Sequence, residues 1–116
     1  MKYKITDSQL ESVVFLYLDN QDFIPIEKGN NIYFVNSEGD EYAQIRYNED
    51  DGWCYIHYKL VDEISSFFSL WGADSKEFIG RWVENTLEME VTNNINCDRY
   101  GIDWLRIPPR LKDENV

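Results

Sequence analysis

The stretch IYFVNSEGDEYAQIRYNEDDGWCYIHY, residues 32–58, decides the fold. Its aromatic and β-branched residues alternate with polar residues, as in strands that bury one face. Two acidic turns, around Gly39 and Gly52, interrupt the alternation, and short turns of this composition join antiparallel strands. The three strand-length pieces are residues 32–35, 41–47 and 53–58. The stretch therefore predicts an antiparallel β-meander.

The middle piece shows how the two faces of the meander divide. Because successive side chains leave a strand on opposite faces, Tyr42 and Arg46 point one way while Ala43, Ile45 and Tyr47 point the other. We expect the second set to be buried and the first to face solvent. The simplest interpretation is an ordinary solvated sheet face. However, tyrosine and arginine are typical interface anchors, so this face and its acidic turns also form a candidate interaction surface. Its residues are Tyr33, Tyr42, Arg46, Tyr55, Asp40, Glu41, Asp50 and Asp51.

Apolar residues recur at helical spacing outside the meander. The helices are expected at residues 7–18, 60–71 and 74–87. Thr6 and Asp74 are suitable N-caps for the first and third helices, and Gly72 is a suitable C-cap for the second. Gly80 inside the third helix costs roughly 1 kcal/mol relative to alanine, and the close approach of another helix would explain it.

Aromatic side chains of these helices are expected to form the main core. Each contributes roughly 1.5–3 kcal/mol on burial. They are Phe15, Phe67, Phe68, Trp71, Phe78 and Trp82.

The remaining segments carry weaker signals. Residues 23–26 resemble a strand, but Pro25 cannot donate a ladder hydrogen bond, so an edge strand is expected. Residues 88–92 alternate and predict a short strand, and from about residue 93 an irregular tail follows. The order of elements predicts an α+β fold, an antiparallel β-meander of three to five strands with about three helices on one face. With no linker in the sequence, a single domain over residues 1–116 is expected.

The chain is strongly acidic. It has 22 aspartates and glutamates against 11 lysines and arginines, a formal charge of −11. Such a surface repels phosphate backbones and anionic lipids, which argues against direct nucleic-acid binding and against membrane binding. It attracts basic protein surfaces and speeds their encounter. A protein partner with a basic surface is therefore the leading expectation.

The cysteines and the apolar stretches indicate a cytoplasmic protein. Cys54 and Cys97 are too few for a disulfide scaffold, and no signal-peptide pattern opens the chain. The longest mostly apolar stretch, residues 13–18, is far shorter than the ~20 residues of a membrane-spanning helix. We expect a soluble protein in the cytoplasm.

No group of residues points clearly to catalysis or to a cofactor. His57 is the single histidine, and the two cysteines lie too far apart for zinc-ligand spacing. Neither glycine turn fits the calcium-loop template, and no phosphate-binding glycine motif occurs, so no metal and no cofactor are expected. An enzyme that uses surface carboxylates or His57 is an alternative, although Cys54 points away from His57 in the strand.

Three segments resemble those of small uncharacterised proteins encoded by tailed bacteriophages of marine bacteria. The segments are residues 36–47 (NSEGDEYAQIRY), 51–56 (DGWCYI) and 81–87 (RWVENTL), within a likeness that covers roughly residues 4–92. The resemblance implies no activity, cofactor or functional residue. It implies a host-cell cytoplasm and a small accessory protein of the kind that acts by binding a host protein.

These observations lead to one preferred function and two alternatives. The preferred function is non-enzymatic protein–protein interaction, in which the acidic, tyrosine-bearing surface binds a host or otherwise basic partner. The first alternative is a self-associating structural protein, in which the edge strand or an aromatic patch makes a homodimer. The second is the small enzyme described above, which requires a concave pocket that gathers titratable groups.

Overall fold

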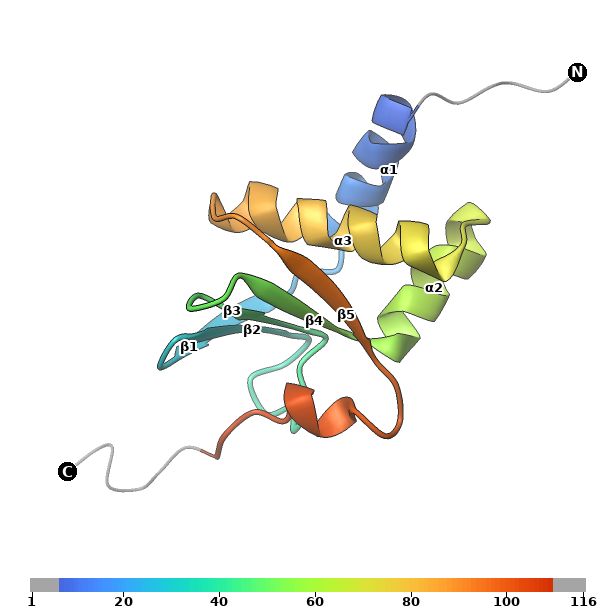
Figure 1. Cartoon of the computed structure of the whole chain (residues 1–116). Coiled ribbons are helices and arrows are strands. Elements are labelled where there is room, and N and C mark those ends of the chain that lie inside the picture. The colour runs from blue at the N-terminus through green and yellow to red at the C-terminus, as the bar shows by residue number, and fades with distance from the viewer. Residues whose placement is uncertain (1–6, 110–116) are drawn as a thin grey trace, which may run out of the picture.

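The computed structural model describes residues 7–109 (Figure 1). Its elements in chain order are α1 (Asp7–Asp19), β1 (Ile24–Lys28), β2 (Asn31–Val35), β3 (Ile45–Asn48), β4 (Trp53–His57), α2 (Tyr58–Phe68), α3 (Gly72–Leu87), β5 (Asn93–Cys97) and the 3-10 helix η1 (Ile102–Leu105). Thr6, the predicted N-cap of the first helix, lies outside the described residues. No helix within residues 7–109 is both long enough and apolar enough to cross a bilayer.

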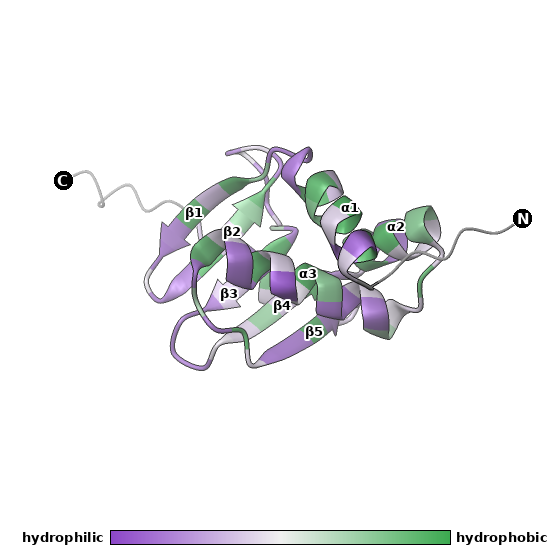
Figure 2. Ribbon diagram, turned by 90° about the horizontal axis from the view of Figure 1, so that it is seen from above, coloured by the Kyte–Doolittle hydropathy of each residue, from purple (hydrophilic) through white to green (hydrophobic). Residues whose placement is uncertain are grey.

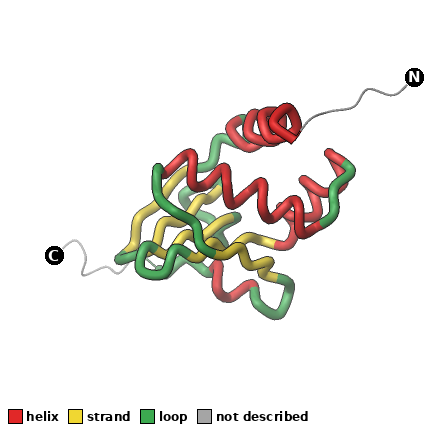
Figure 3. Tube along the Cα trace, turned by 45° about the horizontal axis from the view of Figure 1, so that its top comes forward, coloured by secondary structure: helices red, strands yellow, loops and turns green. Residues whose placement is uncertain are grey.

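The strands form one sheet in the order β1-β2-β3-β4-β5. Neighbours from β1 to β4 are antiparallel, whereas β5 runs parallel to β4. A parallel neighbour requires a crossover, which α2 and α3 provide. Figure 3 shows the three α-helices packed on one side of the sheet, so the predicted α+β class is confirmed. β1 is an edge strand, as Pro25 predicted.

The main core lies between the helices and the sheet. Trp82 is at its centre and is only 5% exposed; its ring centroid lies 5.4 Å from that of Phe34, and its Nε1 donates to Asp19 at 2.9 Å. Aliphatic side chains of helices and strands surround it, among them Val14, Leu18, Ile32, Ile45, Ile56, Ile64, Ile79 and Val83.

Two of the aromatic residues predicted for the core lie at the surface instead. Phe67 is 66% exposed and Trp71 is 81% exposed. Phe67 lies in the last turn of α2. Trp71 lies beyond the helix, because α2 ends early: Ser69 adopts the left-handed conformation at φ 56° and caps the helix. Trp71 therefore lies just before α3, and Gly72, predicted as the C-cap of α2, is the first residue of α3. Asp74, predicted as N-cap, lies inside the first turn of α3.

The middle strand of the meander is shorter than the predicted range 41–47. Its first residues pair with the end of the chain rather than with both neighbouring strands. The Ala43 N–H donates to the Leu105 carbonyl at 2.8 Å, and the Ile107 N–H donates to the Glu41 carbonyl at 2.9 Å. Residues 105–107, far away in the sequence, therefore form hydrogen bonds with backbone groups that were predicted to pair within the meander.

The region after α3 differs from the prediction in two ways. Residues 88–92 form no strand, because Glu88 at φ 57° caps α3 and the chain then crosses to the sheet. The Thr92 N–H donates to the Gly52 carbonyl at 2.8 Å, which brings β5 alongside β4. The expectation of an irregular tail from about residue 93 is therefore wrong for β5 and η1.

Gly80 is required by close packing, although its neighbour is not another helix. A Cβ built on Gly80 would overlap the side-chain amide of Asn94 in β5. The Oδ1 of Asn94 is buried there, and within the described chain it accepts no hydrogen bond. The glycine thus allows α3 to lie directly against the crossover strand.

The sheet is covered on its other side as well. We call this side the second face, and we call η1 with residues 106–109 the C-terminal cover. Leu105 is fully buried beside Tyr55, and Ile107 packs on the cluster that contains Tyr33. Figure 1 shows η1 on the side of the sheet away from α3. The predicted solvent-facing side of the meander is therefore largely covered.

Candidate functional site

Three of the predicted interaction residues lie in a row on the second face. Tyr33 is opposite Arg46, and Arg46 is opposite Tyr55, in the register of β2, β3 and β4. Tyr33 is 3% exposed and Tyr55 is 8% exposed, so the expectation that these tyrosines face solvent is wrong. Ile45 and Tyr47 face the main core as predicted, but Ala43 lies with Tyr33 on the second face, because it precedes the regular strand β3. Alternation also does not show which segment covers each face.

Arg46 holds the C-terminal cover on the sheet. Its guanidinium lies 4.8 Å from the centroid of the Tyr55 ring, on which Trp104 stacks at 5.7 Å with 11° between the planes. Arg46 Nη1 donates to the Trp104 carbonyl at 3.0 Å, and Nε donates to Asn31 at 2.9 Å. Burial raises the pKa of Tyr55, and Asp51 adds to this rise. The phenol therefore stays neutral near pH 7, and this group acts as a structural clasp.

Asp40, Glu41 and Tyr42 form a second group, beside the C-terminal cover. Arg106 joins them: its Nη1 donates to Glu41 at 2.6 Å, and its Nη2 donates to the Tyr42 hydroxyl at 2.6 Å. The Arg106 guanidinium also lies 4.8 Å from the centroid of the Tyr42 ring. Asp40 accepts two backbone N–H groups of its own loop, at 3.0 and 3.1 Å. Arg106 thus partly neutralises Glu41, and Asp40 fixes the loop.

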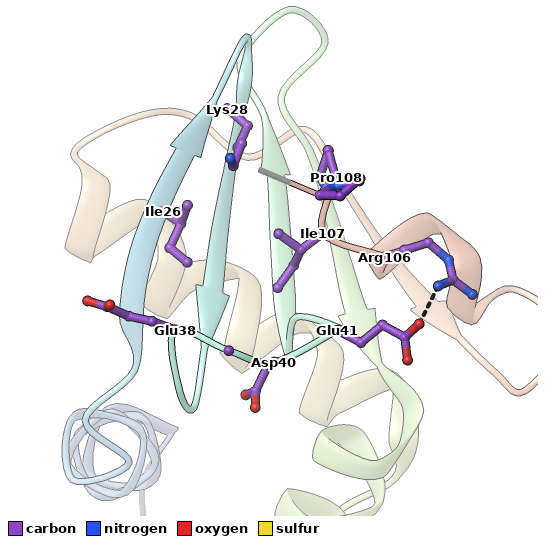
Figure 4. Close-up of a pocket in the computed structure, with 10 residues that line it drawn as sticks. Ile26, Lys28, Glu38, Asp40, Glu41, Arg106, Ile107 and Pro108 are labelled. Atoms are coloured by element: carbon purple, nitrogen blue, oxygen red, sulfur yellow. Dashed lines mark hydrogen bonds and ion pairs between the residues drawn. The ribbon is translucent and has the colours of Figure 1, made fainter. Parts of the chain in front are cut away.

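A groove of about 560 Å³ opens between β1 and the C-terminal cover, next to this second group. Figure 4 shows Ile26 and Ile107 on its two sides, with Glu38, Asp40 and Glu41 at one end. Its lining is completed by Lys28, Gly39, Arg106, Pro108 and Pro109. We call it the acidic groove. It combines apolar walls with one anionic end.

Asp50 and Asp51, the remaining predicted residues, lie away from the acidic groove. They belong to the turn between β3 and β4, at the end of β3 opposite the loop that carries Asp40. Asp50 accepts from the Asn30 side chain at 2.8 Å, and Asp51 accepts from the Trp53 N–H at 2.9 Å. The structure therefore does not bring the two acidic turns together.

Sequence reasoning missed the walls of the groove that come from the end of the chain. Ile107 and Arg106 lie more than 60 residues from Glu41, and no local period marks them. The one available signal is the group of cations near Trp104, which reverses the charge of an otherwise acidic chain. Such a reversal predicts a tail that folds back on the acidic body, as residues 102–109 do, but it does not identify which of these residues line the groove.

His57 has a structural role at the end of β4. It is 6% exposed, and its Nδ1 accepts the Lys59 N–H at 3.1 Å, which caps α2. Its ring stacks on Tyr58 at 5.1 Å. Burial lowers the pKa of His57, and the charge of Lys59 lowers it further. The neutral imidazole therefore has its acceptor nitrogen engaged by the backbone.

The two cysteines are buried on opposite faces of the sheet. Cys54 belongs to the main core, whereas Cys97 lies opposite His57 in the register of β4 and β5. Burial raises the pKa of Cys97 to about 11, and it also raises that of Cys54. Both thiols are therefore protonated near neutral pH, which disfavours a nucleophilic role.

No function can be assigned from a metal site in the described residues or from similarity to a known protein. Within residues 7–109, no three histidine, cysteine or acidic side chains gather closely enough to hold a metal ion. Comparisons of the chain with protein-family models, with curated proteins and with solved structures found no match. The acidic groove is therefore the candidate site on the grounds of its geometry and charge.

Proposed function

We propose that the protein is a non-enzymatic binding protein whose acidic groove takes an extended, basic segment of a partner protein. The observation that carries the proposal is the composition of the groove, with Ile26 and Ile107 as side walls and Glu38 at an anionic end. Apolar walls with a few polar groups are typical of sites that bind a side chain and fix its orientation.

The charges at the anionic end favour a lysine or arginine of the partner. Glu41 is already paired with Arg106, and Asp40 is engaged by its own loop. Glu38 is exposed and forms no ion pair with any described residue, so its carboxylate remains open to a cation from outside. The net charge of −11 adds long-range attraction for a basic partner.

Recognition fits the groove better than catalysis does. Its described lining contains no imidazole and no thiol, and one of its three carboxylates is neutralised by an arginine. General acid–base catalysis needs a group placed to take up or release a proton, and His57 lies outside this lining. In line with the phage resemblance, we place this recognition in the cytoplasm of a host cell.

The test uses a short, extended model peptide in which lysine alternates with valine, titrated in a calorimeter. Glu38→Lys should weaken its binding about fivefold, because a surface ion pair contributes up to about 1 kcal/mol. Glu27→Lys is the matched control, because Glu27 lies on β1, has the same charge and points to the other face of the sheet.

The control variant should change the affinity less than about twofold at moderate salt, where screening limits long-range effects. Equal weakening by both substitutions would show that the peptide senses only the net charge. Either that result or undetectable binding to the unmodified protein would refute the groove as a recognition site.

A further inference from the structure

A second, apolar surface lies on α1 and α2, outside the acidic groove. Val13 is 45% exposed, Leu16 is 59% exposed and Phe67 is 66% exposed. The half-buried Tyr17 links them: it lies within one turn of Val13 and Leu16, and its ring centroid is 4.9 Å from that of Phe67. We call these four residues the aromatic ridge. Figure 2 shows hydrophobic turns on both α1 and α2 where the two helices lie near each other.

The ridge is not required by the core of the protein. Other residues of the same helices fill the core, including Val14 and Leu18 of α1 and Leu60 and Ile64 of α2. Single exposed apolar side chains are ordinary on protein surfaces. Several that adjoin one another across two helices form a patch, and contiguous apolar patches mark surfaces that meet a partner.

The ridge carries a negative charge beside its aromatic rings. The Tyr17 hydroxyl donates to the carboxylate of Glu63, one turn before Phe67 on α2. Burial raises the pKa of Tyr17 to about 12, and the bond to Glu63 contributes to this rise, so the phenol remains a donor. Asp62 adds a second exposed carboxylate on α2. Lys59 lies one turn before Glu63, and the two form no ion pair.

This charge decides between two possible occupants of the ridge. In a symmetric dimer the same patch meets itself, so both copies would bring a Glu63 carboxylate into one partly dehydrated interface, and the patch would add no cation to pair with them. The repulsion would add to that between two chains of net charge −11. A partner with lysine or arginine beside its apolar stripe would instead pair with Glu63 and cover Leu16 and Phe67.

We propose that the aromatic ridge binds a basic amphipathic helix of a partner protein, with its apolar stripe on Leu16, Tyr17 and Phe67 and a cation at Glu63. A helix presents such a stripe through residues spaced at i, i+3, i+4 and i+7. This surface lies on the helical side of the sheet, whereas the acidic groove lies on the second face. The two proposals therefore rest on different residues and fail separately.

The probe is an idealised amphipathic peptide of about 14 residues, with leucine on one side and lysine on the other. Its binding is measured by calorimetry, and its helix content by circular dichroism. Leu16→Ser and Phe67→Ser should each weaken binding about tenfold, since burying a leucine or phenylalanine contributes about 1.5 kcal/mol or more. Tyr100→Ser is the matched control, because Tyr100 is 88% exposed and lies outside the ridge.

A peptide of the same composition in scrambled order separates apolar recognition from charge attraction. It should bind more weakly to the unmodified protein and should not distinguish Leu16→Ser from Tyr100→Ser. Glu63→Gln should weaken the amphipathic peptide less than Phe67→Ser does. Thermal unfolding of each variant checks that the fold is intact. Leu16→Ser should leave the melting temperature unchanged, because Leu16 is the most exposed aliphatic residue of the ridge.

Two results would overturn the proposal. One is equal affinity of the peptide for the ridge variants and for Tyr100→Ser. The other is a dimer in light scattering that dissociates on Phe67→Ser, because a second copy would then be the occupant. Loss of peptide binding in Leu16→Ser and Phe67→Ser, with a monomer at every concentration, would support it.

Discussion

The two faces of the sheet are covered in different ways. On one face α1, α2 and α3 bury a continuous core around Trp82. On the second face the C-terminal cover is held by Leu105 and Ile107 together with the Arg46 clasp and the Arg106 ion pair. Burial over many residues is cooperative, whereas a short cover with few anchors can open by itself. We therefore expect one face to set the global stability and the other to control a local opening beside the acidic groove.

The largest expected effect tests this contrast directly. Trp82→Ala should lower the free energy of unfolding by about 3–5 kcal/mol, because it leaves a cavity in the core and removes the bond to Asp19. Trp104→Ala, on the second face, removes an indole that is 56% exposed and should cost about 1 kcal/mol. Urea denaturation measures both. Equal losses would mean that the two faces contribute alike.

A smaller effect is expected where α3 meets β5. Gly80→Ala should destabilise the protein by about 1–3 kcal/mol, because the new methyl group overlaps the Asn94 amide. Adding Asn94→Ala removes the overlapping atoms and should recover most of the loss, since the buried Oδ1 has no hydrogen bond to lose. Thermal unfolding of the single and double variants checks this. Failure of the second substitution to rescue would place the strain elsewhere.

Loss of the Arg46 clasp on the second face should affect local opening of the C-terminal cover more than the free energy of global unfolding. Arg46→Met keeps much of the side-chain length but removes the contacts to Tyr55 and to the Trp104 carbonyl. The global loss should be about 1–2 kcal/mol, because the partly exposed Arg46 loses its hydrogen bonds to Asn31 and to the Trp104 carbonyl. The Ala43 and Ile107 amides form the hydrogen bonds that join residues 41–43 to the C-terminal cover. Their hydrogen exchange should accelerate.

In the same experiment the core amides should keep their protection, because they exchange only on global unfolding. Uniform acceleration throughout the sheet would contradict the idea of a separately opening cover.

The smallest predicted effect concerns pH. The pKa of His57 is lowered by burial, so the unfolded chain binds the proton more readily than the native protein does. The stability that this group contributes is fully present above its unfolded pKa of about 6.5 and is lost as the pH falls through the lower native value. His57→Asn should flatten this dependence, because asparagine can cap α2 without titrating. Parallel stability curves for the two proteins would disprove it.

Local patterns predicted most of the fold. The meander and the three helices follow from periodicity and turn residues, which act over short distances. β5 was missed because Asn93, Asn94 and Asn96 are poor strand formers, and only its parallel pairing with β4 places them in the sheet. The early end of α2 was missed because Phe67 and Trp71 continue the helical pattern of apolar residues. The helix ends at Ser69, whose left-handed conformation this pattern does not predict.

The candidate site was only half visible in the sequence. Asp40 and Glu41 mark an acidic turn, but Ile107 and Arg106 reach them through folding of the chain end. The same covering segment turned Tyr33 and Tyr55 from expected surface anchors into buried residues. A covering segment of this kind leaves no periodic signal, so which face of a strand is exposed depends on contacts that no local pattern records.

The insertion of β5 next to β4 has a consequence for synthesis on the ribosome. Each hairpin from β1 to β4 can close soon after its second strand emerges, because its partner lies directly before it in the chain. The outer edge of β4 has no such partner until residue 97 has been translated, after both crossover helices. Until then the nascent chain presents an open strand edge, the feature through which incomplete proteins recruit one another into aggregates.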